Sequence, residues 1–213
     1  MKEILVLAGP SAVGKTTVAS HLLASGEFSL VRSVTTRAPR GDAFDSEYIY
    51  LSREKMQSLV KEGGVLEHTE YAGELYGTPT SEIDRIIAEG KHPLLILDLN
   101  GVASLSKRED IRPCAVYIHA PLEVLEARLR ARYLDPEKGI IASDKLDSRL
   151  KKNREDYARI ANNDLYFYAF IENVGTPDAT AAAVKKEFSR FLLGEKRDEK
   201  TLLEASKRLS FSE

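Results

Sequence analysis

The fold of this chain is decided by residues 9–16, GPSAVGKT, which satisfy the pattern G-x-x-x-x-G-K-[ST] of a phosphate-binding loop. An apolar run, Ile4–Ala8, precedes this P-loop, and a segment with helical periodicity begins at Thr17. The order of strand, loop and helix is the context in which the motif binds phosphate. Residues 9–16 therefore predict an α/β domain that binds a nucleoside triphosphate.

The chemistry of the P-loop assigns roles to its side chains and its backbone. Glycines let backbone N–H groups approach phosphate oxygens, and the positive N-terminal end of the following helix attracts the same anion. Lys15 is expected to reach the β- and γ-phosphates, and the hydroxyl of Thr16 to bind Mg²⁺. The predicted ATP-binding residues are Gly9, Pro10, Ser11, Ala12, Val13, Gly14, Lys15, Thr16 and Thr17. A glycine-rich turn without a ligand would rarely have both Lys15-Thr16 and these flanks.

A second cationic segment, SVTTRAPR at residues 33–40, follows soon after the P-loop. Arg37 and Arg40 stand three positions apart beside hydroxyl side chains, and guanidinium groups bind phosphate through paired hydrogen bonds. The alternative is solvated surface charge in a turn around Pro39. Together with the P-loop, the segment indicates a second phosphorylated substrate, and hence phosphoryl transfer between two nucleotides.

Composition limits the remaining possibilities. The chain has 213 residues, 43% of them hydrophobic, which suits one domain with a mobile subdomain. The formal net charge of −2 gives no support for broad nucleic-acid binding. A single cysteine, Cys114, fits a reducing compartment, and neither a signal peptide nor an apolar run of membrane-spanning length is present. We therefore expect a cytoplasmic protein that binds neither nucleic acid nor membrane.

Apolar runs alternate with amphipathic segments, which predicts a parallel core sheet with helices on both faces. The expected core strands are Ile4–Ala8, Leu30–Val34, Pro93–Leu99, Cys114–His119 and Tyr166–Ile171. The expected helices are Thr16–Ala24, Ser52–Glu62, Glu82–Glu89, Leu122–Tyr133, Lys145–Ile160 and Ala179–Leu193.

Three segments depart from this alternation. Short strands at Tyr48–Leu51, Val65–Tyr71 and Glu74–Tyr76, the last two joined at Ala72-Gly73, predict a small β-rich insertion. Residues 133–148 are polar and lack an apolar stripe, so we expect a loop or lid. From Gly194 a charge-dense stretch leads to a possible short helix over residues 201–209.

With these motifs the chain resembles the guanylate kinases of the nucleoside monophosphate kinase group, over about residues 3–193. The most specific match combines TTRAPR at 35–40 with LYGTP at 75–79. The resemblance implies Mg²⁺-dependent phosphoryl transfer from ATP to GMP or dGMP by a domain of residues 1–193. That domain would comprise a core (1–34 and 80–193), a GMP-binding region (about 35–79) and a lid (about 133–148), followed by a charged tail, 194–213. The resemblance is compatible with either a monomer or a homodimer.

The resemblance also implies how the acceptor nucleotide is held. Positions that hold the GMP phosphate in the family match Arg37, Arg40, Tyr48 and Tyr76. Positions that recognise guanine match Ser33, Glu67 and Thr78, with Asn100 nearby. The Glu67 carboxylate suits guanine, whose N1–H and N2–H groups are two adjacent donors that adenine lacks. A packed strand tyrosine is the alternative for Tyr48, and an exposed strand residue is the alternative for Glu67.

The remaining predicted catalytic residues act on the phosphates. Asp98 follows the apolar strand ending in Leu97, where a carboxylate can act on Mg²⁺ directly or through water. Its alternative role is to cap a helix over residues 101–104. Positions matching Arg132 and Arg149 embrace the ATP phosphates in the family, and Lys15 and Arg37 complete the predicted catalytic set. Solvated ion pairs on helix faces are the alternative for the two arginines.

The chain departs from the family pattern at several positions. Asn100 stands where the family has an acid or a glutamine, in a segment one residue shorter, which weakens the prediction of guanine. The lid is longer than usual, and 173–175 replaces a more acidic turn. Ala12 replaces a glycine, which is tolerable if its φ is negative.

Two other functions compete with guanylate kinase activity. One is a catalytically inactive guanylate-kinase-like binding module, and the other is a P-loop kinase for a different phosphorylated acceptor. Intact Lys15, Thr16 and Asp98 argue against the first, whereas Asn100 leaves the second open.

Overall fold

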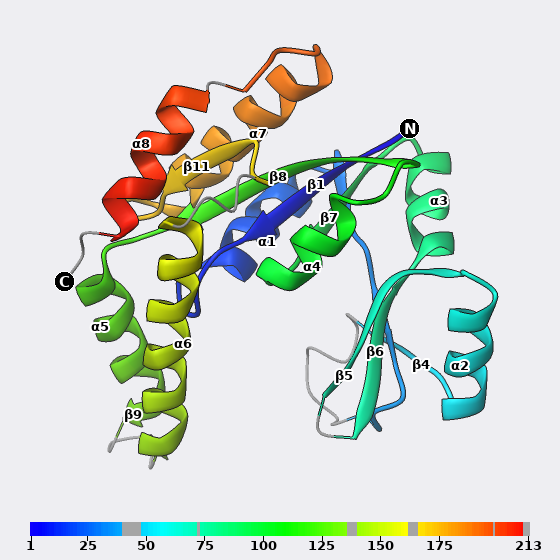
Figure 1. Ribbon diagram of the computed structural model, residues 1–213, viewed down its shortest axis with the longest axis horizontal. Helices are drawn as coiled ribbons and strands as arrows, with labels where there is room; N and C mark the ends of the chain where they lie inside the picture. Colours follow the sequence, from blue (N-terminus) through cyan, green and yellow to red (C-terminus); the bar gives the residue numbers. More distant parts are fainter. Residues whose placement is uncertain (40–47, 72, 136–139, 162–165, 198, 211–213) are drawn as a thin grey trace.

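The computed structural model describes residues 1–39, 48–71, 73–135, 140–161, 166–197 and 199–210 (Figure 1). Its core sheet contains β1 (Lys2–Ala8), β2 (Phe28–Leu30), β7 (His92–Ile96), β8 (Ile111–His119) and β11 (Ala169–Glu172). A smaller sheet contains β3 (Ser33–Thr35), β4 (Tyr48–Tyr50), β5 (Val65–Tyr71) and β6 (Glu74–Pro79), and β9 (Leu134–Asp135) pairs with β10 (Ile140–Ile141). The helices are α1 (Lys15–Ala24), α2 (Arg53–Lys61), α3 (Thr80–Ala88), α4 (Leu99–Leu105), α5 (Leu122–Tyr133), α6 (Ser143–Ala161), α7 (Pro177–Leu192) and α8 (Glu199–Ser210). None of these described helices combines the length and apolar character needed to cross a membrane.

The core sheet confirms the predicted α/β class. Its five strands are all parallel, in the order β11-β8-β1-β7-β2. Continuous apolar runs form the central strands because both faces are covered, and Ile4–Ala8 is fully buried. Helices α1 and α7 pack together on one face, and α4 lies on the other (Figure 1).

The strand order creates a crevice at the carboxyl edge of the core sheet. From β1 the chain passes through α1 to β2 on one side, whereas from β7 it passes through α4 to β8 on the other. Ligands of open α/β sheets bind where connections diverge in this way. The P-loop leaves β1 at this edge, and Asp98 leaves β7 beside it.

The smaller sheet has one apolar face and one polar face. Its strands follow the order β4-β3-β6-β5. Helix α2 covers one face with fully buried Met56, and a Cβ on Gly77 would lie 2.9 Å from the Met56 methyl carbon. Because side chains alternate along a strand, the residues between those on the α2 side form the opposite face. Of the predicted acceptor residues, that face carries Ser33, Tyr48, Glu67, Tyr76 and Thr78.

Several predicted boundaries are wrong for identifiable reasons. The expected strand Leu30–Val34 divides between the two sheets, because Val31 N–H still bonds to the Leu94 carbonyl in the core sheet and β3 begins at Ser33. The expected strand Pro93–Leu99 ends at Ile96, because Asp98 caps α4. The expected strand Tyr166–Ile171 begins only at Ala169.

Residues 133–148 are not a continuous loop. The described part forms the β9–β10 pairing and then the first turns of α6, which begins at Ser143. Buried Leu146 supplies the apolar anchor that the sequence analysis overlooked. Beyond Gly194, α8 packs against α6 and β11 and buries Leu209, so the described tail is docked on the core (Figure 1).

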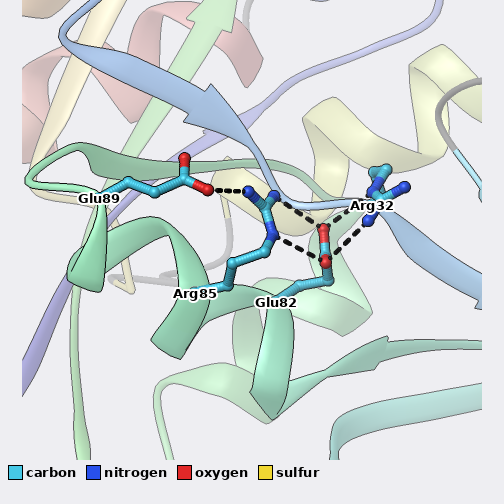
Figure 2. A network of polar contacts seen from close by, with 4 residues as sticks. All are labelled: Arg32, Glu82, Arg85 and Glu89. Atoms are coloured by element: carbon cyan, nitrogen blue, oxygen red, sulfur yellow. Dashed lines mark hydrogen bonds and ion pairs between the residues drawn. The ribbon is translucent and has the colours of Figure 1, made fainter.

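The chain passes from the core sheet to the smaller sheet between β2 and β3, and it returns after β6. Charged side chains join these two crossings (Figure 2). Arg32 lies between β2 and β3, and Glu82 lies in the first turn of α3, just after β6. The Arg32 Nε and Nη2 atoms each donate to the Glu82 carboxylate at 2.9 Å, while Arg85 donates to it at 3.0 and 3.1 Å. The Glu82 side chain is 7% exposed, and hydrogen bonds from Arg32 lower its pKa to about 2. Glu82 is thus the acceptor that holds the two crossings together.

Replacing this carboxylate tests its contribution. Glu82→Gln is expected to lower the free energy of unfolding at pH 7 by about 1–3 kcal/mol, because charge-assisted bonds to both arginines are weakened. The native pKa lies below the ordinary 4.5, so the contribution is present above pH 4.5 and is lost as pH falls toward 2. Urea unfolding at pH 7 and pH 3 should show the gap between variant and wild type closing. Glu89→Gln, which changes an exposed partner of Arg85, is the control, and an equal loss there would contradict the assignment.

Candidate active site

The P-loop has the backbone geometry that only glycine accommodates at its two ends. Gly9 has φ 148° and Gly14 has φ 99°. A Cβ on Gly9 would lie 2.1 Å from the Ile118 carbonyl oxygen, and one on Gly14 would lie 2.6 Å from the Asn173 amide nitrogen. Ala12 has φ 64°, so the condition under which alanine would be tolerated without strain, a negative φ, is not met. The left-handed conformation explains why glycine suits this position better.

Two buried asparagines hold carbonyl groups of the P-loop from outside. Asn173 Nδ2 donates to the Val13 carbonyl at 2.7 Å, and Asn153 Nδ2 donates to the Ser11 carbonyl at 3.1 Å. A trans peptide group is planar, with C=O and N–H on opposite sides. The N–H groups that follow Ser11 and Val13 therefore point away from the asparagines.

Other contacts support the same loop. Arg128, on α5, donates to the Asn173 carbonyl at 3.0 Å and to the Val13 carbonyl at 3.4 Å. The Asn173 side-chain oxygen in turn accepts from Thr180 Oγ1 at 2.7 Å, which fixes the orientation of the amide. The turn at 173–175 is thus a support for the P-loop.

The Lys15 side chain folds back over the P-loop. Its Nζ donates to the carbonyl oxygens of Gly9 at 2.7 Å and Pro10 at 3.0 Å. Burial lowers the pKa of the ammonium group to about 8, with the charges of Asp156 and Asp98 acting to raise it and that of Arg149 to lower it. An anion of high charge at the loop would favour the protonated form.

A cavity of about 420 Å³ lies over the P-loop, and the predicted catalytic residues Arg132 and Arg149 help to line it. The cavity is lined by Ser11, Ala12, Gly14, Lys15, Thr16, Thr17, Leu129, Arg132, Tyr133 and Arg149. Arg149 Nη1 lies 3.4 Å from Ser11 Oγ, and the Arg132 guanidinium lies 5.8 Å from the Tyr133 ring centroid. The cavity has the cationic lining that a polyphosphate requires.

Thr16 lines this cavity, and the negative charge of Asp98 acts on Lys15, which lines it too. Thr16 is exposed in the first turn of α1. Asp98 Oδ1 accepts from Gly101 N–H at 2.8 Å and caps α4, so the alternative capping role is observed. No cluster of three or more His, Cys, Asp or Glu side chains that could hold a metal occurs among the described residues. A hydroxyl and a carboxylate fit Mg²⁺, which takes its other oxygens from phosphate and water.

Aromatic rings and one arginine form the polar face of the smaller sheet. The Arg37 guanidinium lies 5.3 Å from the Tyr48 ring centroid and 5.8 Å from that of Tyr50, and its Nη2 donates to Tyr50 Oη at 3.3 Å. The Tyr48 and Tyr76 rings meet edge to face at 6.3 Å. The structure therefore brings Arg37, Tyr48 and Tyr76 together, and Arg40 lies outside the described residues.

The base-recognition residues lie on the same face. Thr78 Oγ1 donates to the Glu67 carboxylate at 2.7 Å, and Ser33 pairs in register with Tyr48. Burial raises the pKa of Glu67; the Thr78 hydrogen bond opposes this shift, and the negative charge of Asp98 adds to it. Asp98 acts on the pKa of both Lys15 and Glu67, and α4, which it caps, packs against β5, the strand of Glu67.

Asn100 is bound by a neighbour that the sequence analysis missed. Its Oδ1 accepts from Arg159 Nη1 at 2.8 Å. A guanidinium group only donates, so the Asn100 oxygen is engaged and its amide nitrogen points elsewhere. Arg159 thereby fixes the orientation of the Asn100 amide, and the role of Asn100 toward the base stays a prediction.

Sequence reasoning also missed Asn153, Tyr50 and the supporting role of Asn173. Tyr50 had a usable signal, since it stands two positions after Tyr48 and shares its face of the strand. Asn153 stands seven residues after buried Leu146 and seven before buried Ile160, a polar residue on an apolar helix face.

The state of Lys15 generates a prediction about pH. Because the pKa of Lys15 is about 8, raising the pH above 8 removes the positive charge that a triphosphate needs. Affinity for a non-hydrolysable ATP analogue should weaken progressively between pH 8 and pH 10, as measured by calorimetric titration. Lys15→Arg keeps its charge throughout this range, so its affinity should be independent of pH. A wild-type affinity that stays constant up to pH 9.5 would contradict the assignment.

Comparison with known proteins agrees with this geometry. The family model described as guanylate kinase matches residues 1–171. The chain is 36% identical over 175 residues to the guanylate kinase of Parasynechococcus marenigrum (78% of this chain, 92% of that protein), and 34% identical over 189 residues to that of Homo sapiens (85% and 94%). The crystal structure of guanylate kinase from Anaplasma phagocytophilum shares the fold, with a TM-score of 0.61 at 24% identity, covering 89% of this chain and 86% of that one. This chain therefore belongs to the guanylate kinase family.

Proposed function

We propose that the protein transfers the γ-phosphoryl group of ATP to GMP, giving ADP and GDP. The observation that carries the proposal is the position of Asp98, which connects the P-loop side of the core sheet with the smaller sheet. Asp98 follows β7, which lies beside the P-loop strand β1, and it caps α4, which packs against β5, the strand of Glu67. Its negative charge also acts on the pKa of both Lys15 and Glu67. Phosphoryl transfer needs adjacent donor and acceptor sites more than it needs a protein nucleophile.

The donor site would use the P-loop and its cavity. Lys15 would exchange its hydrogen bonds to the Gly9 and Pro10 carbonyls for the β- and γ-phosphates of ATP. Arg132 and Arg149 line the same cavity and would stabilise the charge that spreads over the transferred group. Ala12, Gly14 and the first residues of α1 would supply backbone N–H groups, whereas Pro10 has none and the Ser11 N–H is bound to Asn153.

The acceptor site would use the polar face of the smaller sheet. Arg37 would bind the GMP phosphate with the hydroxyls of Tyr48 and Tyr76, and Arg40 is proposed to join them. An oxygen of that phosphate attacks the γ-phosphorus while the bond to the β-phosphate oxygen breaks. The new anhydride bond replaces the old one, so no group of the protein is phosphorylated.

Guanine recognition would rest on Glu67, Ser33 and Thr78. The ionised Glu67 carboxylate accepts from the N1–H and N2–H groups of guanine, and Thr78 holds that carboxylate at 2.7 Å. Adenine would leave the partly desolvated carboxylate unpaired, which is strongly disfavoured. Asn100, whose oxygen is held by Arg159, is proposed to offer its amide N–H₂ group, a donor, to the base.

Other residues of the chain bear on the metal ion, on a lid and on the cellular compartment. Thr16 and Asp98 would hold Mg²⁺, directly or through water, and the ion would neutralise charge between the phosphates. The β9–β10 region and the start of α6 are proposed as a lid. The free, buried thiol of Cys114 suits a reducing cytoplasm.

Acceptor selectivity tests the proposal most simply. Coupled ADP release should be rapid with GMP and dGMP and slow with IMP, AMP and UMP. Glu67→Gln should lower kcat/KM for GMP by about 10- to 100-fold, the loss expected for a charged hydrogen-bond acceptor. Glu70→Gln is the matched control, because Glu70 stands on the same strand and faces Arg53.

The alternatives make different predictions. An inactive binding module would bind GMP without turning over any acceptor. A kinase for another phosphorylated acceptor would prefer a nucleotide other than GMP, and that result would contradict the role assigned to Glu67.

A further inference from the structure

Asn153 lies on α6, far in sequence from the P-loop, yet both ends of its side-chain amide contact Ser11. Its Oδ1 accepts from Ser11 N–H at 2.7 Å, and its Nδ2 donates to the Ser11 carbonyl at 3.1 Å. Asn153 is 1% exposed. A buried amide is costly unless its donor and acceptor are paired, and here one backbone residue pairs with both.

This two-point contact sets the orientation of two successive peptide groups. Because Ser11 C=O points to Asn153, the N–H of Ala12 points away from it. Because Ser11 N–H points to Asn153, the carbonyl of Pro10 points away as well. The structure shows the consequence directly, since the Pro10 carbonyl accepts from Lys15 Nζ at 3.0 Å on the phosphate side of the loop.

The face of α6 that carries Asn153 also carries charged groups directed at the P-loop. Arg149 is one turn earlier and lies 3.4 Å from Ser11 Oγ. Asp156 is one turn later, and its negative charge acts on Lys15. The contact between Asn153 and Ser11 therefore holds this charged face of α6 against the P-loop.

We propose that Asn153 is a positioning residue for the triphosphate. It holds the peptide groups on either side of Ser11 so that the Ala12 N–H faces the phosphates before ATP arrives, as Asn173 does for Gly14. The inference rests on the donor half of the proposed function, namely ATP at the P-loop. Pre-orientation of this kind strengthens binding because no loop ordering is required on association.

Binding measurements on the full chain test the role. Asn153→Leu removes both hydrogen bonds while keeping the branching and the number of side-chain heavy atoms, and Asn153→Ala removes the side chain beyond Cβ. Calorimetric titration should show the Kd for ATP weakened about tenfold in both variants, the equivalent of one good hydrogen bond. The Kd for inorganic tripolyphosphate should increase by the same factor, because the contact affects phosphate binding and not base binding. The Kd for GMP should stay within about twofold of the wild type.

Tyr157→Phe is the matched control. Tyr157 lies on the same helix, is buried, and exchanges hydrogen bonds with the Ala120 backbone. Its loss should lower the melting temperature and leave the Kd for ATP and tripolyphosphate unchanged. If a folded Asn153→Leu protein binds both ligands like the wild type, or if GMP binding weakens equally, the positioning role is wrong.

The test of Asn153 and the test of the proposed function can fail independently of each other. If the wild type binds ATP but no acceptor is phosphorylated, the proposed function fails while the tenfold effect of Asn153 on ATP binding still supports its role. If GMP turnover is present and the Asn153 variants bind ATP normally, only the positioning role fails.

Discussion

Peptide planarity is the constraint on which this site depends. Each P-loop carbonyl that is held from outside turns the next N–H group toward the space above the loop. Asn153 and Asn173 supply the donors for Ser11 and Val13. The glycines at positions 9 and 14 allow the loop to pass against the Ile118 carbonyl and the Asn173 amide, where any side chain would collide.

The two asparagine side chains that donate to P-loop carbonyls come from elements at the carboxyl edge of the core sheet. Asn173 follows β11, and Asn153 lies on α6, which approaches the loop over that edge. The same edge presents Asp98 after β7, beside β1, where it caps α4 and α4 packs against β5. The smaller sheet is held to the core by its two chain crossings, which Glu82 joins through Arg32. The fold thus sets both the orientation of the phosphate-binding groups and the distance between the two sites.

Local patterns predicted much of this arrangement. The P-loop, the parallel sheet and the helix Leu122–Tyr133 follow from short-range periodicity and from a motif of eight residues. Contacts between distant residues could not be predicted in this way: Ser11 and Asn153 are 142 positions apart. The division of 30–34 between two sheets depends on which partner strand is available, and the positive φ of Ala12 depends on the loop as a whole. The contact of Arg159 with Asn100 joins residues 59 positions apart and could not be predicted either.

The central claim is that one protein molecule holds the two nucleotides with their phosphates facing each other. A bisubstrate compound, adenosine and guanosine joined through five phosphates, tests it directly by calorimetric titration. The account predicts one compound bound per chain, at least a hundredfold more tightly than either ATP or GMP alone, since the second nucleotide binds without a separate association cost. It also predicts much weaker binding of the matched compound with two adenosines. Binding no tighter than that of ATP, or equal binding of both compounds, would contradict the account.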